Sequence, residues 1–519
     1  MRKVYFLSIL SFAMCAGLCG QQRSFPDFPP ADVTRAMDAA QMRWQLGVAF
    51  DPLPSKTEFY HSFLLPKYRS LGADAALGPR NPDQPDGNWT WLTGKSTTEG
   101  LPGGGTTITQ SQGNLWNNYI QAWEPGGAYL TGADFYGPLE WHNLEGLTAS
   151  DWPARRAQIF EELQQELYGV IPEGAKNLNI TWTVSGDTTG VSGGMAFSQY
   201  NLLGTIDISS YPEVRNAPVI SCVVRVPTEN SSPGEKIPLI IGFGGRVDQM
   251  LWESFAPLGI GVMGFNLNLL QPDNGAGLTS YLIGLVNKGN WRKPNDWGTL
   301  VAWSWGVSRI IDYFESHNAG IDPSRIGLTG HSRYGKATLV TMAYEPRIAI
   351  SFPSSSGSLG AVPARRHWGQ DLENSAGESE YHWMAGNFMK YVGVHPSSTD
   401  GYLPRKVLDL KVDAESLVAL CAPRPILIGS GSELPGDSWV DPYGQYLVAV
   451  AASPVYELLG KKGVIMADFI EYNGERIPYP RTDKDYLAGD IGYRRHNGGH
   501  TASPNYPAFA LFTARYFLK

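Results

Sequence analysis

The chain reads Gly330-His331-Ser332-Arg333-Tyr334-Gly335-Lys336 between a short apolar run, residues 325–329, and a segment rich in helix formers, residues 336–343. A strand, a glycine-flanked serine and a helix in this order form the layout of a nucleophile elbow. The two glycines allow a sharp bend and a close approach of helix and strand. The second glycine comes one residue later than in the usual G-x-S-x-G pattern. We predict that Ser332 is a nucleophile; the alternative is a serine that caps an ordinary helix.

Short apolar runs and amphipathic segments alternate on both sides of this elbow. Predicted strands cover residues 218–227, 237–243, 259–265, 325–329, 348–352 and 425–428, and predicted helices cover residues 297–315, 336–344, 414–420 and 506–518. This alternation indicates a mainly parallel central sheet with helices on both faces, in which the first pair of strands can be antiparallel. The sequence therefore predicts an α/β-hydrolase fold, a three-layer αβα sandwich.

The chain divides into three predicted regions. Residues 1–20 combine the basic start Met1-Arg2-Lys3 with an apolar run and small residues, as a secretory signal peptide does. We expect cleavage near the end of this segment, although its two cysteines leave lipid attachment open. Residues 21–150 are rich in Pro, Gly, Asn and Trp and are expected to form an irregular N-terminal extension or lobe. Residues 151–519 are expected to form the catalytic domain.

Composition limits the partners and the compartment. The net charge is −8 without a basic block, so nucleic acid is not an expected partner. After the signal-like segment, no apolar stretch reaches the ~20 residues that span a bilayer. Only Cys222 and Cys421 remain there, too few for a disulfide scaffold, and the sequence does not decide between buried thiols and pairing. We expect a secreted or periplasmic monomer.

A nucleophilic serine needs a base within hydrogen-bond reach, and on this fold the chain order is serine, acid, histidine. His500 lies in the Gly-rich loop Asn497-Gly498-Gly499-His500-Thr501, just before the last predicted helix. His496 is the nearest rival, but Arg494 and Arg495 beside it suggest a solvated turn. The sequence predicts His500 as the base; a loop histidine without a role is the alternative.

The acid should follow a late strand at the carboxyl edge of the sheet. Beyond the predicted strand 425–428 lie Glu433, Asp437 and Asp441. Asp441 precedes a proline and so favours the start of a helix, while Glu433 lies close to the strand. We predict Asp437 as the acid, with the other two as alternatives.

The oxyanion of an acyl-transfer reaction needs fixed hydrogen-bond donors. The backbone N–H of Arg333 follows the nucleophile, and Gly242-Phe243-Gly244-Gly245 could supply a second backbone donor. The cationic side chains of Arg333 and Lys336 either donate to the oxyanion and to a polyhydroxylated substrate or form surface salt bridges. The sequence has neither a zinc signature nor a dinucleotide fingerprint, so no metal or other cofactor is expected.

The elbow resembles that of the glucuronoyl esterases, carbohydrate esterases that cut the ester between glucuronoyl groups of xylan and lignin alcohols. Their pattern G-x-S-R-x-G-K is matched by Gly330, Ser332, Arg333, Gly335 and Lys336. Residues 302–309, the pair His382-Trp383 and residues 437–442 are also similar to bacterial members. The resemblance covers roughly residues 150–519 and implies an α/β-hydrolase fold, a Ser-His-acid triad and no metal.

The resemblance also implies roles for residues around the elbow. Arg333 would help to hold the oxyanion, and Lys336 would bind hydroxyls of the uronic acid. Trp439 would lie against the sugar, with Gln370 and Glu378 as further sugar contacts.

The triad acid distinguishes two types within that family. Fungal members carry a Glu after the strand that follows the elbow, whereas this chain reads Ser354-Ser355-Ser356-Gly357 there. Asp437 instead resembles the acid position of many bacterial members. Fungal members also place a Cys before the nucleophile, where this chain has His331.

The function expected from the sequence is therefore a secreted serine esterase that hydrolyses esters of (4-O-methyl-)D-glucuronic acid, as in lignin–glucuronoxylan cross-links. One alternative is another carbohydrate esterase on the same fold, such as an acetyl xylan esterase. The other is a non-catalytic carbohydrate-binding protein that keeps the fold.

Overall fold

The computed structural model describes residues 25–47, 139–229, 234–365, 370, 372–376, 380–391, 409–432, 437, 440–472 and 475–518. Its strands are β1 (Ile180–Ser192), β2 (Met195–Ile206), β3 (Val219–Pro227), β4 (Ile237–Phe243), β5 (Gly261–Phe265), β6 (Ile321–His331), β7 (Ile350–Ser354), β8 (Ile426–Gly431), β9 (Phe469–Tyr472), β10 (Glu475–Pro478) and β11 (Ile491–His496).

Helices connect and cover these strands. The α-helices are α2 (Arg35–Leu46), α7 (Trp152–Leu163), α8 (Glu173–Lys176), α9 (Gln249–Phe255), α10 (Leu267–Leu270), α11 (Tyr281–Asn287), α12 (Thr299–Ser316), α13 (Arg333–Tyr344), α14 (Leu372–Ser375), α15 (Ala414–Ala419), α16 (Pro442–Leu458) and α17 (Tyr506–Phe517). Shorter turns of helix are η3 (Glu140–His142), η4 (Gln164–Tyr168), η5 (Ala256–Leu258), η6 (Gly275–Thr279), η7 (Tyr381–Trp383), η8 (Gly386–Tyr391) and η12 (Ser503–Asn505).

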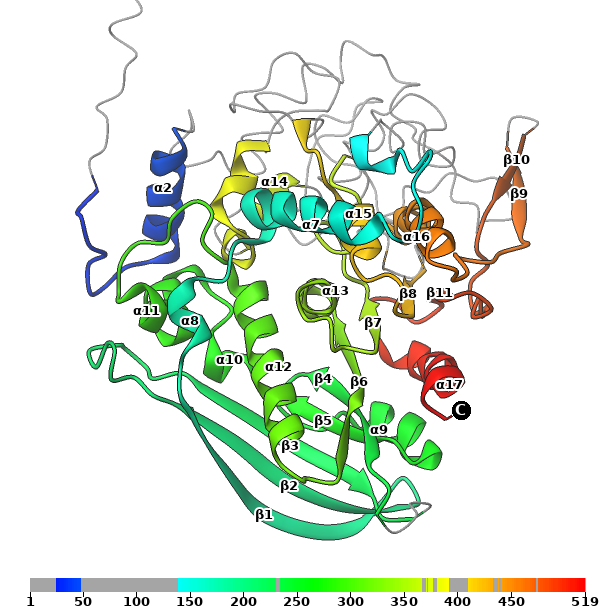
Figure 1. The fold of residues 1–519 in the computed structure, drawn as a ribbon, viewed down its shortest axis with the longest axis horizontal. Coiled ribbons are helices and arrows are strands. Elements are labelled where there is room, and N and C mark those ends of the chain that lie inside the picture. The colour runs from blue at the N-terminus through cyan, green and yellow to red at the C-terminus, as the bar shows by residue number, and fades with distance from the viewer. Residues whose placement is uncertain are drawn as a thin grey trace, which may run out of the picture.

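One large sheet organises the described residues, in the order β1-β2-β3-β5-β4-β6-β7-β8-β11 (Figure 1). The pairs from β5 through β4, β6, β7 and β8 to β11 are parallel, whereas β1, β2 and β3 run antiparallel up to β5. Because parallel strands share one carboxyl edge, the loops after β6, β7, β8 and β11 leave the sheet on the same side.

Apolar side chains hold helices against both faces of this sheet. On one face, Trp252 and Phe255 of α9 and Phe509 of α17 pack on Ile240 and Phe352 of the central strands. On the other face, α12, α13 and α16 cover the sheet in a second apolar cluster. Burial of each large apolar side chain is worth about 1.5–3 kcal/mol. The predicted three-layer α/β-hydrolase architecture is confirmed.

The predicted central strands and helices are confirmed within a few residues. The first two predicted strands, β3 and β4, run in opposite directions as expected but are not neighbours in the sheet. β3 and β4 do not pair; β3 is antiparallel to β5, which lies between them. The strands β1 and β2 were not predicted. β1 is largely exposed and rich in Thr, Ser and Gly, so it lacks the apolar run that marks a buried strand.

The N-terminal segment contains a helix where the sequence predicted irregular structure. α2 begins after Thr34, whose hydroxyl accepts a hydrogen bond from the Met37 N–H at 3.2 Å, and ends at Gly47 in the left-handed conformation. Met42 is buried in the same apolar cluster as the side chains of α12, α13 and α16, and α2 packs against η6 and η8. This part of the extension is therefore packed into the same core as the helices that cover the sheet.

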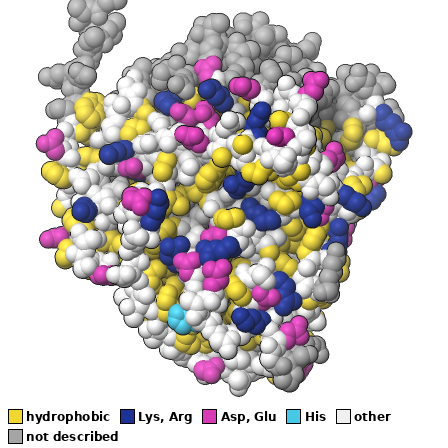
Figure 2. All heavy atoms as spheres, in the orientation of Figure 1, with side chains coloured by type: hydrophobic (Ala, Val, Ile, Leu, Met, Phe, Trp, Pro, Cys, Tyr) yellow, Lys and Arg dark blue, Asp and Glu magenta, His cyan; other side chains and the backbone are white. Residues whose placement is uncertain are grey.

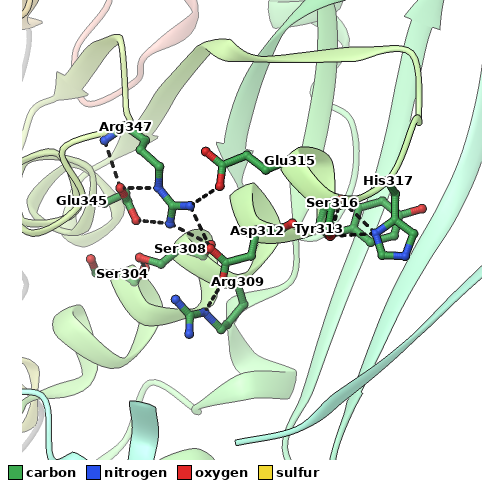
Figure 3. A network of polar contacts seen from close by, with 10 residues as sticks. All are labelled: Ser304, Ser308, Arg309, Asp312, Tyr313, Glu315, Ser316, His317, Glu345 and Arg347. Atoms are coloured by element: carbon green, nitrogen blue, oxygen red, sulfur yellow. Dashed lines mark hydrogen bonds and ion pairs between the residues drawn. The ribbon is translucent and has the colours of Figure 1, made fainter. Parts of the chain in front are cut away.

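Surface charges form local networks of mixed sign. Figure 2 shows acidic and basic side chains interspersed over one face. In Figure 3, Arg347 points toward Glu345, Asp312 and Glu315, with which it forms ion pairs of 2.7–2.8 Å that tie the end of α12 to the turn before β7. Within the part of the chain that the structure describes, none of the helices has the length and apolar character needed to cross a bilayer.

Candidate active site

Ser332 lies at the sharp turn between β6 and α13. Its backbone adopts φ 61° and ψ −127°, a conformation that costs a non-glycine residue free energy. The turn is fixed because the Ser332 N–H donates to the Ser354 carbonyl at 2.9 Å. A Cβ on Gly330 would collide with the Tyr334 carbonyl, and one on Gly335 with the Ser354 carbonyl. Both glycines of the motif are thus required by close backbone packing, and the turn is strained as in a nucleophile elbow.

Asp437 and His500 form a short hydrogen-bonded pair beside this turn. Nδ1 of His500 lies 2.7 Å from Oδ1 of Asp437, whose side chain is fully buried. The other carboxylate oxygen, Oδ2, accepts from the Gly431 N–H and from the Ser355 hydroxyl, each at 2.7 Å. The His500 ring lies 4.3 Å from the ring of His331, the residue before Ser332. The structure thus gathers the three residues that the sequence singled out; their catalytic roles remain predictions.

The rival residues occupy different environments. His496 ends β11 and is buried, with Nε2 2.8 Å from the Thr501 carbonyl oxygen. The prediction of a solvated turn there is wrong, because Arg495 is also buried and stacks on Tyr479. Asp441 caps α16 by accepting from the Gly444 N–H at 2.9 Å, which confirms the predicted helix start. Glu433 lies outside the described residues.

Two amides of the glycine loop after β4, where the sequence predicted a second oxyanion donor, already have backbone partners. The N–H groups of Gly244 and Gly245 both donate to the Phe265 carbonyl, at 3.1 and 3.0 Å. These two amides are already engaged in joining β4 to β5, so neither is a free donor in this structure.

The Arg333 side chain is held by a carboxylate that the sequence analysis did not single out. Nε of Arg333 lies 2.5 Å from Oδ2 of Asp273. Oδ1 of the same carboxylate contacts Nε2 of His382 at 2.9 Å and accepts from the Trp383 indole at 2.6 Å. Burial raises the pKa of Asp273, but the hydrogen bonds from His382 and Trp383 and the charge of Arg333 together lower it below its usual value.

Lys336 is buried beneath the elbow rather than exposed on it. Its ammonium group donates to the carbonyls of Ser356 and Ser358 and to Oε1 of Gln370, at 2.5, 2.7 and 2.9 Å. Burial lowers the pKa of Lys336 to about 7, against the opposing charge of Glu380. All three N–H donors have protein partners, so a hydroxyl of the substrate could bind only by replacing one of them.

Gln370 links this lysine to a further carboxylate. Its amide nitrogen donates to Glu380 at 3.0 Å, and the Trp383 ring lies 5.7 Å from the Lys336 ammonium. Trp439 and Glu378, the other predicted sugar contacts, lie outside the described residues. Sequence reasoning missed Asp273, Ser355 and Glu380, because each contacts the site across a chain separation that leaves no local pattern.

Comparisons with known proteins place this chain in a family. A sequence profile described as fungal glucuronyl esterase matches residues 213–460. A solved glucuronoyl esterase from Teredinibacter turnerae T7901 is 30% identical and superposes with a TM-score of 0.67, over 93% of this chain and 99% of that one. The chain belongs to the glucuronoyl esterase family.

The chain matches curated members of the glucuronoyl esterase family over only part of their length. A carbohydrate esterase from an unknown prokaryotic organism is 34% identical over 40% of this chain and 42% of its own length. A 4-O-methyl-glucuronoyl methylesterase from Podospora anserina is 30% identical over 62% of this chain and 60% of its own. The chain thus spans less than two thirds of either relative.

Proposed function

We propose that this protein is an exported serine esterase that hydrolyses esters of (4-O-methyl-)D-glucuronic acid, as in lignin–glucuronoxylan cross-links. The observation that carries the proposal is the 2.7 Å pair of Asp437 and His500 beside the strained Ser332. The names of the relatives, glucuronoyl esterase and 4-O-methyl-glucuronoyl methylesterase, support the substrate class. Export is supported by the signal-like residues 1–20, which lie outside the described residues.

Acylation begins when His500 accepts the hydroxyl proton of Ser332 at Nε2. Asp437 holds Nδ1–H, so it fixes the tautomer and stabilises the imidazolium that forms. The Ser332 oxygen attacks the ester carbonyl carbon, and the backbone N–H and the guanidinium of Arg333 stabilise the oxyanion. Collapse of the tetrahedral intermediate breaks the bond to the alcohol oxygen, which leaves with the proton from His500.

Deacylation repeats these steps with water as the nucleophile. His500 removes a proton from the water, the hydroxide attacks the acyl carbon, and Ser332 leaves with the proton that His500 returns. The products are the free uronic acid and the alcohol, and the enzyme is restored. Lys336 and Gln370 lie beneath the elbow, and we assign them to the hydroxyls of the uronic acid, one of which would replace a protein partner of the Lys336 ammonium. Trp439 and Glu378 are assigned as further contacts.

A substrate panel tests the proposal. Purified protein should cleave benzyl glucuronate faster than acetylated xylan or xylose, and Ser332→Ala should abolish turnover while the thermal unfolding temperature stays unchanged. A preference for acetyl esters would assign a different carbohydrate esterase. Failure of wild-type protein to react at Ser332 with a labelled fluorophosphonate would favour a binding protein without catalysis.

The acid is tested by comparing three variants. Asp437→Ala should lower kcat far more than Asp441→Ala or Glu433→Ala. Asp441→Ala should instead lower stability by about 1 kcal/mol, because it removes a helix cap. If Asp441→Ala or Glu433→Ala lowered kcat more than Asp437→Ala does, the role of the triad acid would be assigned to Asp441 or Glu433 instead.

A further inference from the structure

One carboxylate joins three separate segments around the elbow. Asp273 lies between α10 and η6, Arg333 opens α13, and the pair His382 and Trp383 belongs to η7. All three partners contact Asp273, which is 17% exposed, whereas the Arg333 side chain is 45% exposed. Without such an anchor, a long exposed arginine samples many rotamers.

The loop that carries Asp273 is itself fixed before any substrate binds. The Asp273 N–H donates to the Asn268 side chain at 3.1 Å. Gln271 is fully buried and bonds the loop on both sides, donating to the Gly277 carbonyl at 2.7 Å and accepting from the Ile283 N–H at 2.9 Å. The carboxylate therefore presents both oxygens from a rigid support, as preorganised electrostatic stabilisation requires.

The charges around this carboxylate explain why an acid stands there. Arg333 and Lys336 are two cations on one turn of α13, and the charge of Arg333 lowers the pKa of Lys336. The anion at Asp273 offsets the charge of Arg333 and fixes its direction. Through Oδ1 it also orients the Trp383 indole, whose ring faces the Lys336 ammonium at 5.7 Å.

We propose that Asp273 is a positioning residue that holds the Arg333 guanidinium in place for oxyanion stabilisation. The inference rests on the proposed function in one respect, namely that Arg333 faces the reacting carbonyl. Asp273 needs no contact with the substrate and exchanges no proton. Its effect reaches the reaction through the side chain that it restrains.

Asp273→Asn separates this role from a merely structural one. In the orientation that keeps Oδ1 as the acceptor for Trp383, the amide replaces only the oxygen that faces Arg333. We expect kcat to fall about 10- to 100-fold with KM nearly unchanged, because misplacement of a catalytic group by about 1 Å has effects of this size. The thermal unfolding temperature should change little.

A double-mutant cycle with Arg333→Ala supplies the decisive readout. Once the guanidinium is gone, Asp273→Asn should change kcat by less than about twofold, because the two residues act as one unit. An equal loss of kcat with and without Arg333 would overturn the proposal, as would a folded Asp273→Asn variant with wild-type kcat.

Asp322 provides a matched control. It pairs with Arg325 in the same way, Nε to Oδ2 at 2.6 Å, and is 19% exposed, but it lies at the start of β6, away from the elbow. Asp322→Asn should leave kcat and KM at wild-type values; a loss like that of Asp273→Asn would mean that kcat reports general loosening of the fold, which would overturn the proposal.

The cycle is independent of the substrate assignment. Wild-type turnover of benzyl glucuronate is measured first. If the wild-type protein cleaves only acetyl or nitrophenyl esters, the substrate proposal fails, and the cycle is run on the ester that is cleaved. The inference about Asp273 is then tested only by the coupling of Asp273→Asn and Arg333→Ala in kcat.

Discussion

Removal of the Ser355 hydroxyl should weaken catalysis without touching the triad. This hydroxyl donates to Oδ2 of Asp437 at 2.7 Å, and both side chains are buried. A hydrogen bond to a charged group is worth about 1.5–3 kcal/mol, so Ser355→Ala should lower the free energy of unfolding by that amount. The Gly431 N–H remains as the second donor to Oδ2.

Only part of this loss should appear in kcat. The carboxylate is charged both before and during proton transfer, so the hydrogen bond itself is present in both states and largely cancels. The catalytic effect arises because an Asp437 carboxylate held by fewer donors can rotate away from the His500 imidazole. We expect kcat to fall about tenfold, which corresponds to about 1.4 kcal/mol, with KM unchanged.

The assay compares kcat on benzyl glucuronate and urea unfolding for Ser355→Ala and Ser453→Ala. Ser453 is a buried serine of α16 that donates to the Ala449 carbonyl at 2.8 Å and accepts from the Val464 N–H at 3.0 Å. Its loss should cost about 1 kcal/mol of stability and leave kcat intact. Wild-type kcat in a destabilised Ser355→Ala variant would refute the reasoning.

Two further perturbations test the fold around the site. Gly335→Ala should lower the free energy of unfolding by about 1–3 kcal/mol and lower kcat, because its Cβ would collide with the Ser354 carbonyl. Gly174→Ala is the control: it has room for a Cβ, so urea unfolding and kcat should both stay at wild-type values. Burial, and to a lesser extent the charge of Arg365, lowers the pKa of His142 from 6.5 to about 4. Between pH 4 and pH 6.5 the imidazole of His142 is protonated in the unfolded chain but neutral in the folded chain. The contribution of His142 to the free energy of unfolding is therefore highest above pH 6.5 and decreases as the pH falls toward 4, by up to about 1 kcal/mol per pH unit. Urea unfolding at pH 7 and 4.5 should show a smaller loss for His142→Gln than for wild type; equal losses would contradict the shift.

The elements that the sequence predicted well are those whose local pattern and tertiary environment agree. β4 was predicted with its observed bounds because it is a short apolar run followed by glycines. β11 was missed because it carries Arg494, Arg495 and His496, which read as a polar turn. Arg495 tolerates burial because its guanidinium donates to the Tyr479 hydroxyl at 2.9 Å and stacks on that ring. The pattern of residues along the chain does not predict that a buried arginine will find such a partner.

The same distinction separates the parts of the site that could be predicted from those that could not. Ser332 sits within a local motif, and His500 follows from the chain order of the fold. Asp273 contacts Arg333, which lies 60 residues later in the sequence, and Ser355 contacts Asp437, which lies 82 residues later. Contacts of this kind depend on which loops share an edge of the sheet, so a single sequence does not reveal them.

The edge of the sheet also explains why spacing left the acid undecided among three residues. β7 and β8 are parallel neighbours, with Ser354 opposite Gly429, and the Ser355 N–H donates to the Gly429 carbonyl at 2.8 Å. The loops after both strands therefore start side by side, and the side chains of Ser355 and Asp437 meet at 2.7 Å. In this chain the second loop supplies the carboxylate, and the first supplies a hydroxyl that holds it. The proposed acid, Asp437, is thus placed by the shared edge of β7 and β8 rather than by a fixed distance from the serine.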